Sequence, residues 1–310
     1  MRVFVAGVTG AIGRPLASGL RAAGHQVTGM TRSAEKARAL ERMGVDAVVC
    51  DVFDAAAVEQ AMRAAHPEVV VHELTDLPAV FNPRRTDYTG TNRLRREGTG
   101  ILVAAARAAG AHRLIAQSIA FLYAPEGGPV KDEDARPIVG APAPFGEAMA
   151  AVLDLEQQVL HADGLHGVVL RYGYFYGPGT HFAADGSIAG EVRRRRFPVV
   201  GSGAGIFSFV HVDDAAAATV AAVERGAPGV YNIVDDDPAP TRLWLPAYAA
   251  ALGAPRPLRI PTLLARLVAG RQVAESATRQ RGASNQKAGR ELGWRPAFPS
   301  WRQGFVSGLG

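Results

Sequence analysis

Cysteine is almost absent from this chain of 310 residues, which contains one, Cys50. A single cysteine excludes an internal disulfide, and such sparing use is typical of a reducing compartment. Cys50 ends a predicted strand, so we interpret it as a buried, unreactive thiol. The fold must therefore be held by its apolar core without covalent cross-links.

Lysine is also scarce: the chain has Lys36, Lys131 and Lys287, and its formal net charge of +5 comes from arginine. The arginines are spread along the sequence apart from the run 193–196. We interpret that run as a solvated helix end, with recognition of a substrate phosphate as the alternative. Dispersed positive charge does not favour nucleic-acid binding, and no nucleic-acid partner is expected.

Long hydrophobic runs are missing as well. The apolar stretch at the N-terminus is interrupted by Gly7, which makes it too short for the core of a signal peptide. No later segment approaches the length of a membrane span, so we expect no membrane partner and residence in the cytoplasm. With 48% hydrophobic and 20% charged residues, the composition is that of a folded globular chain.

The sequence does contain a regular alternation of short β-rich runs and helical stretches, which is typical of βαβ units and a parallel sheet. We predict an α/β fold, a Rossmann-type doubly wound parallel sheet with a smaller C-terminal substrate-binding domain. The Rossmann domain is assigned residues 1–172 plus about 206–234, and the substrate-binding domain about 173–205 plus 235–310. The predicted strands of the sheet cover residues 2–6, 26–31, 47–50, 69–72, 113–118 and 167–171.

A glycine-rich loop joins the first predicted strand to the helix after it, with the sequence Gly7-Val8-Thr9-Gly10-Ala11-Ile12-Gly13. Gly7 permits the tight turn, Gly10 lets the backbone approach a pyrophosphate, and Gly13 lets the helix pack closely on the strand. The N–H groups and the dipole at the helix start then favour a negatively charged ligand. This spacing predicts a dinucleotide site to which Thr9, Ala11 and Ile12 also contribute.

The end of the second predicted strand indicates which dinucleotide is bound. An NAD site has an acidic residue here, roughly 20 residues beyond the glycines, for the ribose hydroxyls. This chain has Thr31, Arg32 and Ser33 instead, and an arginine can pair with a 2′-phosphate while the two hydroxyls donate to it. NADP(H) is therefore favoured, with NAD(H) as the alternative. Asp51 and Val52 follow the third strand, where we expect them to contact the adenine.

With these features the chain resembles the extended short-chain dehydrogenase/reductases, the NAD-dependent epimerase/dehydratase family. The resemblance spans nearly the whole length, and its motifs occur in the family's order. They are Gly7–Gly13, Asp51-Val52, Val71-His72-Glu73-Leu74, Gly98-Thr99, Leu170-Arg171, Tyr176-Gly177-Pro178-Gly179, Phe209–Asp214 and Glu291–Pro296. We expect Leu74, Thr75 and Tyr172, which follow the fourth strand and the sixth, to lie beside the cofactor.

The resemblance implies catalysis by a Tyr-x-x-x-Lys pair, in which the tyrosine exchanges a proton with the substrate oxygen and the lysine lowers the tyrosine pKa. Phe145 and Met149 stand in those two positions here, and residues 140–162 contain neither tyrosine nor lysine. Phenylalanine cannot donate a proton, and methionine carries no charge. Arg95 likewise replaces the family's asparagine. The usual acid/base pair is absent from this chain.

Replacements for the pair are expected at the carboxyl ends of the strands, beside the nicotinamide. Tyr123 follows the fifth strand with Ser118 below it, although Tyr123 could equally pack beneath the substrate loop. The family's serine position itself holds Ile119. Glu73 ends the fourth strand next to His72, and partial burial would move its pKa towards neutrality, while His72 could instead be a buried imidazole bonded to backbone. The candidate catalytic residues are thus Ser118, Tyr123 and Glu73.

The leading functional hypothesis is an NADP(H)-dependent oxidoreductase or epimerase-like enzyme that acts on a small organic substrate with a rebuilt proton relay. One alternative is a redox-neutral cyclase, dehydratase or isomerase with a structural dinucleotide, and another is a non-catalytic dinucleotide sensor. No cluster of histidine, cysteine and carboxylates has the spacing of metal ligands, so no metal is expected. The resemblance also suggests a homodimer through helices 86–109 and 145–161.

Overall fold

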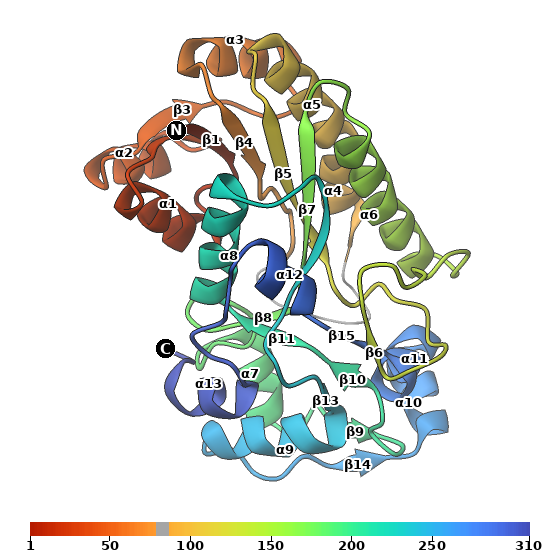
Figure 1. Ribbon diagram of the computed structural model, residues 1–310. Coiled ribbons are helices and arrows are strands. Elements are labelled where there is room, and N and C mark those ends of the chain that lie inside the picture. Colours follow the sequence, from red (N-terminus) through yellow and green to blue (C-terminus); the bar gives the residue numbers. More distant parts are fainter. Residues whose placement is uncertain (79–86) are drawn as a thin grey trace.

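The computed structural model describes residues 1–78 and 87–310, and a seven-stranded sheet forms its centre (Figure 1). The strands lie in the order β12-β7-β5-β4-β1-β2-β3, and every adjacent pair is parallel. The chain therefore winds outwards from β1 in both directions, which confirms the predicted Rossmann-type class. The strand bounds are β1 Arg2–Ala6, β2 Gln26–Thr31, β3 Asp46–Val49, β4 Val69–His72, β5 Arg113–Ile119, β7 His166–Tyr172 and β12 Gly229–Ile233.

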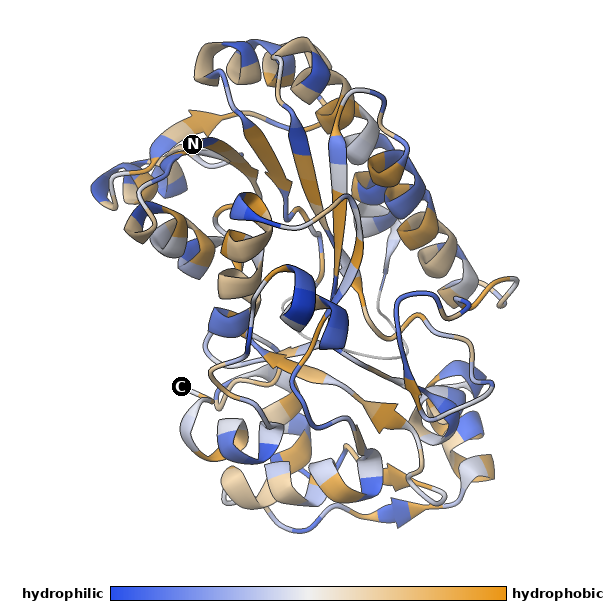
Figure 2. Cartoon of the chain, viewed as in Figure 1, coloured by the Kyte–Doolittle hydropathy of each residue, from blue (hydrophilic) through white to orange (hydrophobic). Residues whose placement is uncertain are grey.

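Helices cover both faces of the sheet, and apolar residues follow the strands and the inner sides of the helices (Figure 2). Val3 and Val5 of β1 pack into one core cluster, whereas Phe4 and Ala6 pack into the cluster on the opposite face. Successive strand residues point to opposite faces, so a strand buried on both sides reads as a continuous apolar run. The first cluster is covered by α1 (Gly13–Ala22), α2 (Ala34–Arg42) and α8 (Val212–Glu224), the second by α3 (Ala55–Ala65), α5 (Thr99–Ala108) and α6 (Phe145–Leu160).

A second, C-terminal lobe lies below the carboxyl ends of the strands (Figure 1). It has its own core, centred on Phe209, Trp244, Tyr248, Trp301 and Phe305. Short strand pairs build it: β8 (Tyr174–Tyr176) with β11 (Phe209–His211), β9 (Val199–Val200) with β14 (Arg259–Ile260), and β10 (Ile206–Phe207) with β13 (Ala239–Pro240). Its helices are α7 (Ser187–Arg193), α9 (Thr241–Ala251), α10 (Thr262–Ala269), α11 (Arg271–Arg279) and α13 (Trp301–Ser307).

Two short elements connect the lobes. β6 (Val130–Lys131), in the long loop after β5, pairs with β15 (Gly282–Ala283), and α12 (Gln286–Glu291) then packs against β12. These contacts bring the loop after β5 against the C-terminal part of the chain. The carboxyl ends of β4, β5 and β7 therefore face the junction between the two lobes.

The helix expected over 86–109 is divided into three consecutive segments. α4 (Thr89–Arg93) leads into a π-helical turn, η1 (Leu94–Gly98), and then into α5. The expected start at Thr86 lies outside the described residues. A π-helical turn inserts an extra residue into the helix, which changes the direction of the side chains before it, and such turns are frequent at functional sites.

The segment 206–212 contains two short strands, β10 and β11, and α8 already begins at Val212. The cap of this helix is His211, whose ring accepts a hydrogen bond from the Asp213 N–H at 3.2 Å. Asp214 instead accepts from the N–H groups of Ala297 and Phe298, at 2.7 and 3.0 Å. It anchors the C-terminal tail to the start of α8.

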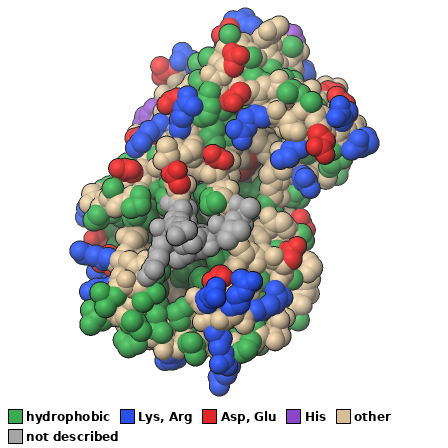
Figure 3. All heavy atoms as spheres, turned by 180° about the vertical axis from the view of Figure 1, so that it is seen from behind, with side chains coloured by type: hydrophobic (Ala, Val, Ile, Leu, Met, Phe, Trp, Pro, Cys, Tyr) green, Lys and Arg blue, Asp and Glu red, His purple; other side chains and the backbone are tan. Residues whose placement is uncertain are grey.

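The surface of the upper lobe mixes charges of both signs, as the rear view shows (Figure 3). No helix among the described residues is long and apolar enough to cross a membrane. Within residues 1–78 and 87–310, no group of three or more histidine, cysteine or acidic side chains could hold a metal ion.

Candidate active site

The loop between β1 and α1 leaves no space for side chains at two of its glycines. Gly7 has a φ of +97°, and a Cβ there would lie 2.6 Å from the carbonyl carbon and oxygen of Glu73, just beyond β4. A Cβ on Gly13 would lie 2.4 Å from the Gly7 oxygen. Ile12 offers no side-chain acceptor to the first turn of α1, where Pro15 has no N–H and the Arg14 N–H donates to the Gly10 carbonyl at 3.4 Å. The positive end of the helix dipole at Gly13 can attract an external anion. This cradle fits the pyrophosphate of a dinucleotide, and the surface at Gly10 and Ala11 is exposed, with Thr9 half-buried.

The segment 31–33 ends β2, next to the glycine loop. Thr31 is buried and its Oγ1 accepts from the Ser33 N–H at 3.3 Å. Ser33 caps α2, accepting from the Lys36 N–H at 3.3 Å, while the hydroxyl hydrogens of Thr31 and Ser33 can still be donated to a ligand. Arg32 between them is exposed. Arg32 and the hydroxyls of Thr31 and Ser33 are thus consecutive at the end of β2.

Asp51 and Val52 follow β3, as expected, but they differ in burial. Val52 belongs to the core beneath α3 and α5, whereas Asp51 is exposed and accepts from the Phe53 N–H at 3.0 Å. The cap of α3 is Asp54, which accepts from the Ala57 N–H at 3.0 Å. Asp51 therefore has no capping role and is accessible at the edge of the sheet.

His72 at the end of β4 is fully buried, as expected for the alternative in which it is a buried imidazole bonded to backbone. Its Nδ1 accepts from the Leu74 N–H at 3.2 Å, so Nε2 carries the hydrogen and lies 3.1 Å from Thr99 Oγ1. Burial lowers the pKa of His72 to about 4, so the ring is neutral at physiological pH. Leu74 is half-buried and Thr75 is exposed.

Glu73 is buried on the face of the sheet that α8 covers. The Tyr172 hydroxyl donates to Glu73 Oε1 at 3.0 Å and lies 2.7 Å from Thr219 Oγ1 of α8. Glu73 Oε2 is buried and has no hydrogen-bond partner among residues 1–78 and 87–310. Burial raises the pKa of Glu73 to about 8, and burial and Glu73 together raise the pKa of Tyr172. At neutral pH Glu73 is a protonated, uncharged acid. Tyr172, expected beside the cofactor, is only 1% exposed, and its hydroxyl is bonded inside the fold to Glu73 and Thr219.

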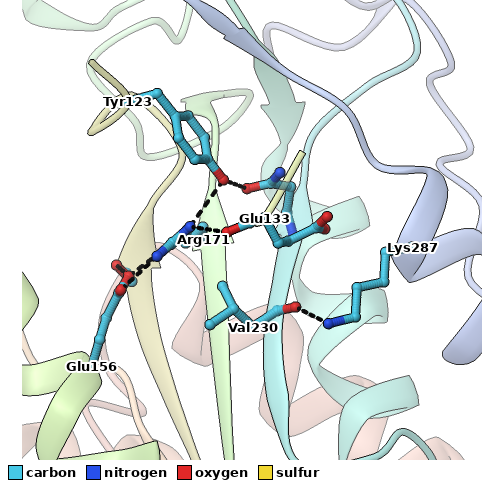
Figure 4. A network of polar contacts seen from close by, with 8 residues as sticks. Tyr123, Glu133, Glu156, Arg171, Val230 and Lys287 are labelled. Carbon is cyan, nitrogen blue, oxygen red and sulfur yellow. Dashed lines mark hydrogen bonds and ion pairs between the residues drawn. The ribbon is translucent and has the colours of Figure 1, made fainter. Parts of the chain in front are cut away.

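Figure 4 shows a buried ion pair between Glu156 of α6 and Arg171 of β7. Ser118 belongs to the network around this pair. Its hydroxyl donates to Glu156 Oε1 of α6 at 2.6 Å. Arg171 of β7 donates to both oxygens of Glu156, at 2.8 and 2.7 Å. A bidentate pair with these bonds satisfies both buried charges. The Ser118 hydroxyl therefore already has a strong acceptor inside the fold.

Tyr123 joins the same network from the other side (Figure 4). Its hydroxyl donates to Asn232 Oδ1 at 2.6 Å and accepts from Arg171 at 3.1 Å. Asn232 in turn donates its N–H to the Glu133 carboxylate at 2.8 Å, and Arg171 donates to the Glu133 carbonyl at 3.1 Å. Burial raises the pKa of Tyr123 to about 12. The structure thus brings Ser118 and Tyr123 together, but both hydroxyls donate to partners within the fold.

Phe145 and Met149, the residues that replace the family's acid/base pair, lie in an apolar cluster at the start of α6. Met149 is 5% exposed and packs with Tyr123, while Phe145, Ile119 and Tyr88 border the same cluster. The side chains of Phe145 and Met149 themselves offer no group that could exchange a proton.

Sequence reasoning missed the partners of the network, above all Glu156, Asn232 and Glu133. One signal was present: Arg171 follows an unbroken apolar run in a central strand, and a buried guanidinium requires a carboxylate partner. Which carboxylate it finds depends on how α6 packs against β7. Arg95, which replaces the family's asparagine, lies in η1 and is half-buried.

The parallel sheet and the glycine cradle define a dinucleotide-binding α/β protein. The NAD dependent epimerase/dehydratase family matches residues 3–234, and the chain belongs to this family. It is 50% identical over 306 residues to a 3-diazoavenalumate denitrifying reductase of a Streptomyces species, which covers 98% of this chain and 99% of the relative. A 2-alkyl-3-oxoalkanoate reductase of Stenotrophomonas maltophilia is 30% identical, covering 83% of this chain and 77% of the relative.

Solved structures agree on the fold. A UDP-glucose 4-epimerase of Thermus thermophilus in complex with NAD has a TM-score of 0.74 and 25% identity, with 100% of this chain and 98% of that chain covered. A human epimerase family protein with NADPH has a TM-score of 0.74 and 23% identity, with coverages of 100% and 99%. The chain is therefore an oxidoreductase-like enzyme that uses a nicotinamide dinucleotide.

Proposed function

We propose that this protein is an NADPH-dependent reductase that removes a diazo group from an organic acid and releases it as N2. The observation that carries this proposal is the apolar pair Phe145 and Met149 in a chain 50% identical to a denitrifying reductase of a diazo acid. The same site that is deficient for carbonyl chemistry is sufficient for this reaction when the substrate is a diazonium ion, because displacement of N2 from that cation by a hydride consumes no proton.

The balance of the reaction explains why no proton is needed. A bound reduced nicotinamide supplies a hydride. In a diazonium ion the C–N bond breaks, its electron pair leaves with N2, and the hydride takes the vacant position on carbon. The reduction of a ketone leaves an alkoxide that an acid must protonate, whereas this substitution forms a neutral C–H bond and a gas. A tyrosine and a lysine at positions 145 and 149 would have no proton to transfer.

The residues of the site then have distinct roles. Gly7, Gly10 and Gly13 let the backbone approach the pyrophosphate, and Arg32 pairs with the 2′-phosphate of NADPH. Phe145 and Met149 keep water from the reacting carbon, where it would compete with the hydride.

Carbonyl reduction is the second candidate, because two relatives at 30% identity are named as a reductase of an oxoalkanoate and as a ketoreductase. Among the three predicted catalytic residues, Glu73 fits that reaction best. It is protonated near neutral pH, and its backbone contacts Gly7 in the cofactor loop. Ser118 and Tyr123 already donate their hydrogens within the fold.

The test uses the purified protein, NADPH deuterated at C4 of the nicotinamide, and a benzenediazonium carboxylate. We expect NADPH oxidation, N2 release, and deuterium on the carbon that carried the diazo group, with none incorporated from D2O. Mixtures without protein control for direct reduction by NADPH. Turnover of a 3-oxo acid, with no enzyme-dependent loss of the diazo group, would overturn the proposal in favour of carbonyl reduction.

A further inference from the structure

Arg95 lies at the carboxyl edge of the sheet, beside the end of β4. It belongs to η1, about one turn before Thr99, whose hydroxyl meets the ring of His72. Since α5 runs back along the sheet from that point, the segment before it extends beyond the strand ends. Tyr88 precedes α4 as its N-cap residue, and Arg95 follows it by seven positions, about two helical turns, so the two residues lie on the same face of this helix.

Arg95 differs from the two arginines beside it. Arg93 pairs with Glu97 at 2.8 Å, and Arg96 pairs with Asp154 of α6 at 2.8 Å. Within residues 1–78 and 87–310, no carboxylate lies within ion-pair distance of Arg95. The sequence of residues 79–86, Ala-Val-Phe-Asn-Pro-Arg-Arg-Thr, contains no acid that could supply one. The chain thus provides this guanidinium with no counterion.

The surroundings of Arg95 make an absent counterion costly. Arg95 is half-buried, and the adjacent Tyr88 packs on the apolar cluster that holds Phe145 and Met149. Burial lowers the pKa of Arg95 to about 10, so the group is still charged at neutral pH. A partly desolvated cation is stabilised by any anion that can reach it. The site therefore favours a ligand that brings a negative charge.

An aromatic surface adjoins the same position. Tyr88 borders the apolar cluster that includes Ala120 and Leu122, the neighbours of Phe121. The ring of Phe121 stacks on Tyr174 at 4.4 Å between centroids, and Tyr174 stacks on Phe207 at 4.6 Å. Phe121 and Tyr174 are only partly buried. A planar, conjugated ligand could lie against these rings while its anionic end points towards Arg95.

We propose that Arg95 binds the carboxylate of an aromatic acid substrate through charge-assisted hydrogen bonds and so selects acids over uncharged analogues. This inference deepens the proposed function, because it names the substrate class of the same site. The reaction of the bound acid rests on the proposed function, whereas the binding of its carboxylate to Arg95 does not. Arg95 acts by positioning the substrate and takes no part in the chemical step.

The experiment measures binding of cinnamate, an aromatic carboxylate without a diazo group, and of cinnamamide, its uncharged analogue, to the NADPH-saturated protein by calorimetry. We expect the wild type to prefer cinnamate. Arg95→Gln should weaken cinnamate binding roughly 10- to 100-fold and leave cinnamamide unchanged, because a hydrogen bond to a charged group is lost. Arg95→Lys should restore part of the preference. Arg96→Gln, which removes the same charge one residue away, is the matched control.

Several outcomes would overturn the inference: a wild type that binds neither ligand or both equally, an Arg95→Gln variant that keeps the preference, or equal losses in Arg95→Gln and Arg96→Gln. Weaker NADPH binding by Arg95→Gln would assign the guanidinium to the cofactor instead and would also overturn it. The proposed function fails by a different result, the absence of enzyme-dependent N2 release. Cinnamate binding is measured without turnover, so the two failures are distinguishable.

Discussion

Glu73 and Tyr172 form a buried hydrogen bond of 3.0 Å, and the second oxygen of the Glu73 carboxyl group has no partner in the part of the chain that the structure describes. An ionised carboxylate with one unbonded oxygen in the core would be strongly unfavourable, whereas a proton on that oxygen removes the charge. This is the physical reason for the raised pKa of Glu73, about 8 compared with its ordinary 4.5. The neutral acid lies directly behind the glycine loop, where Gly7 contacts its backbone.

We first predict that Glu73 makes the stability of the protein fall as the pH rises. In the unfolded chain the carboxyl ionises near pH 4.5, while in the folded chain it keeps its proton up to about pH 8. Between these values the folded state binds the extra proton, so the free energy of unfolding decreases by up to about 1.4 kcal/mol per pH unit. Glu73→Gln, which keeps the shape without the titration, should lose this dependence. The prediction would be contradicted if the melting temperatures of the wild type and of Glu73→Gln changed by the same amount with pH across this range.

The buried histidine has the opposite effect. The folded-state pKa of His72 is about 4, below its ordinary 6.5, so its contribution to stability is complete above pH 6.5 and is lost as the pH falls towards 4. We expect His72→Gln, which does not titrate, to show a smaller loss of stability over this acidic range. Denaturant unfolding at several pH values measures the difference. If both proteins lose stability equally on acidification, His72 is not the buried neutral group that the structure shows.

Ser118→Ala should affect stability and not cofactor binding. The hydroxyl donates to the charged Glu156 at 2.6 Å, and loss of such a bond costs about 1–3 kcal/mol. Glu156→Gln should cost more, about 3–5 kcal/mol, because it leaves Arg171 buried without its counterion. Urea unfolding measures both, and NADPH titration serves as the control readout. A Ser118→Ala variant with full stability and a large loss of turnover would instead assign the serine to the reaction.

Gly7→Ala should abolish tight dinucleotide binding, since its Cβ would lie 2.6 Å from the Glu73 backbone and the loop would have to move. Gly24→Ala is a matched control: Gly24 also has a positive φ, +82°, but no atom lies within 4 Å of its Cβ position. Both substitutions impose the same backbone strain, so only the difference between them reports on the cradle. Equal cofactor affinity in the two variants, measured by fluorescence titration, would refute the assigned role of the loop.

Arg32→Ala should reduce NADPH affinity roughly 10- to 100-fold while NADH affinity is unchanged, because the partner proposed for the exposed guanidinium is the 2′-phosphate, which NADH lacks. Arg38→Ala on the adjacent α2, also exposed, removes the same charge away from the predicted phosphate and should alter neither affinity. The ratio of the two dissociation constants is the measured quantity. A wild type that binds NADH as tightly as NADPH would show that Arg32 does not select the cofactor.

Much of the upper lobe was predictable because its signals are local. Gly24 ends α1 with a positive φ, Asp54 caps α3, and the apolar run at β4 belongs to a strand covered on both faces. Each of these features depends on a few consecutive residues and on backbone preferences that any chain shares. The cap of α8 was not predictable in this way, because aspartate is a good cap residue and two aspartates stand at the start of this helix. Asp214 instead accepts hydrogen bonds from the C-terminal tail, a contact that local sequence does not indicate.

The sequence by itself determined the glycine cradle, the doubly wound order and the absence of a Tyr/Lys pair at 145 and 149, since each follows from residue type and spacing along the chain. Only the tertiary structure decided what the candidate catalytic residues contact. Ser118 and Glu156 are 38 positions apart and Tyr123 and Asn232 are 109 apart, so their partners depend on how α6, β7 and β12 pack. Burial sets the protonation of Glu73 and partly desolvates Arg95. It likewise arises only when segments distant in the sequence exclude water together.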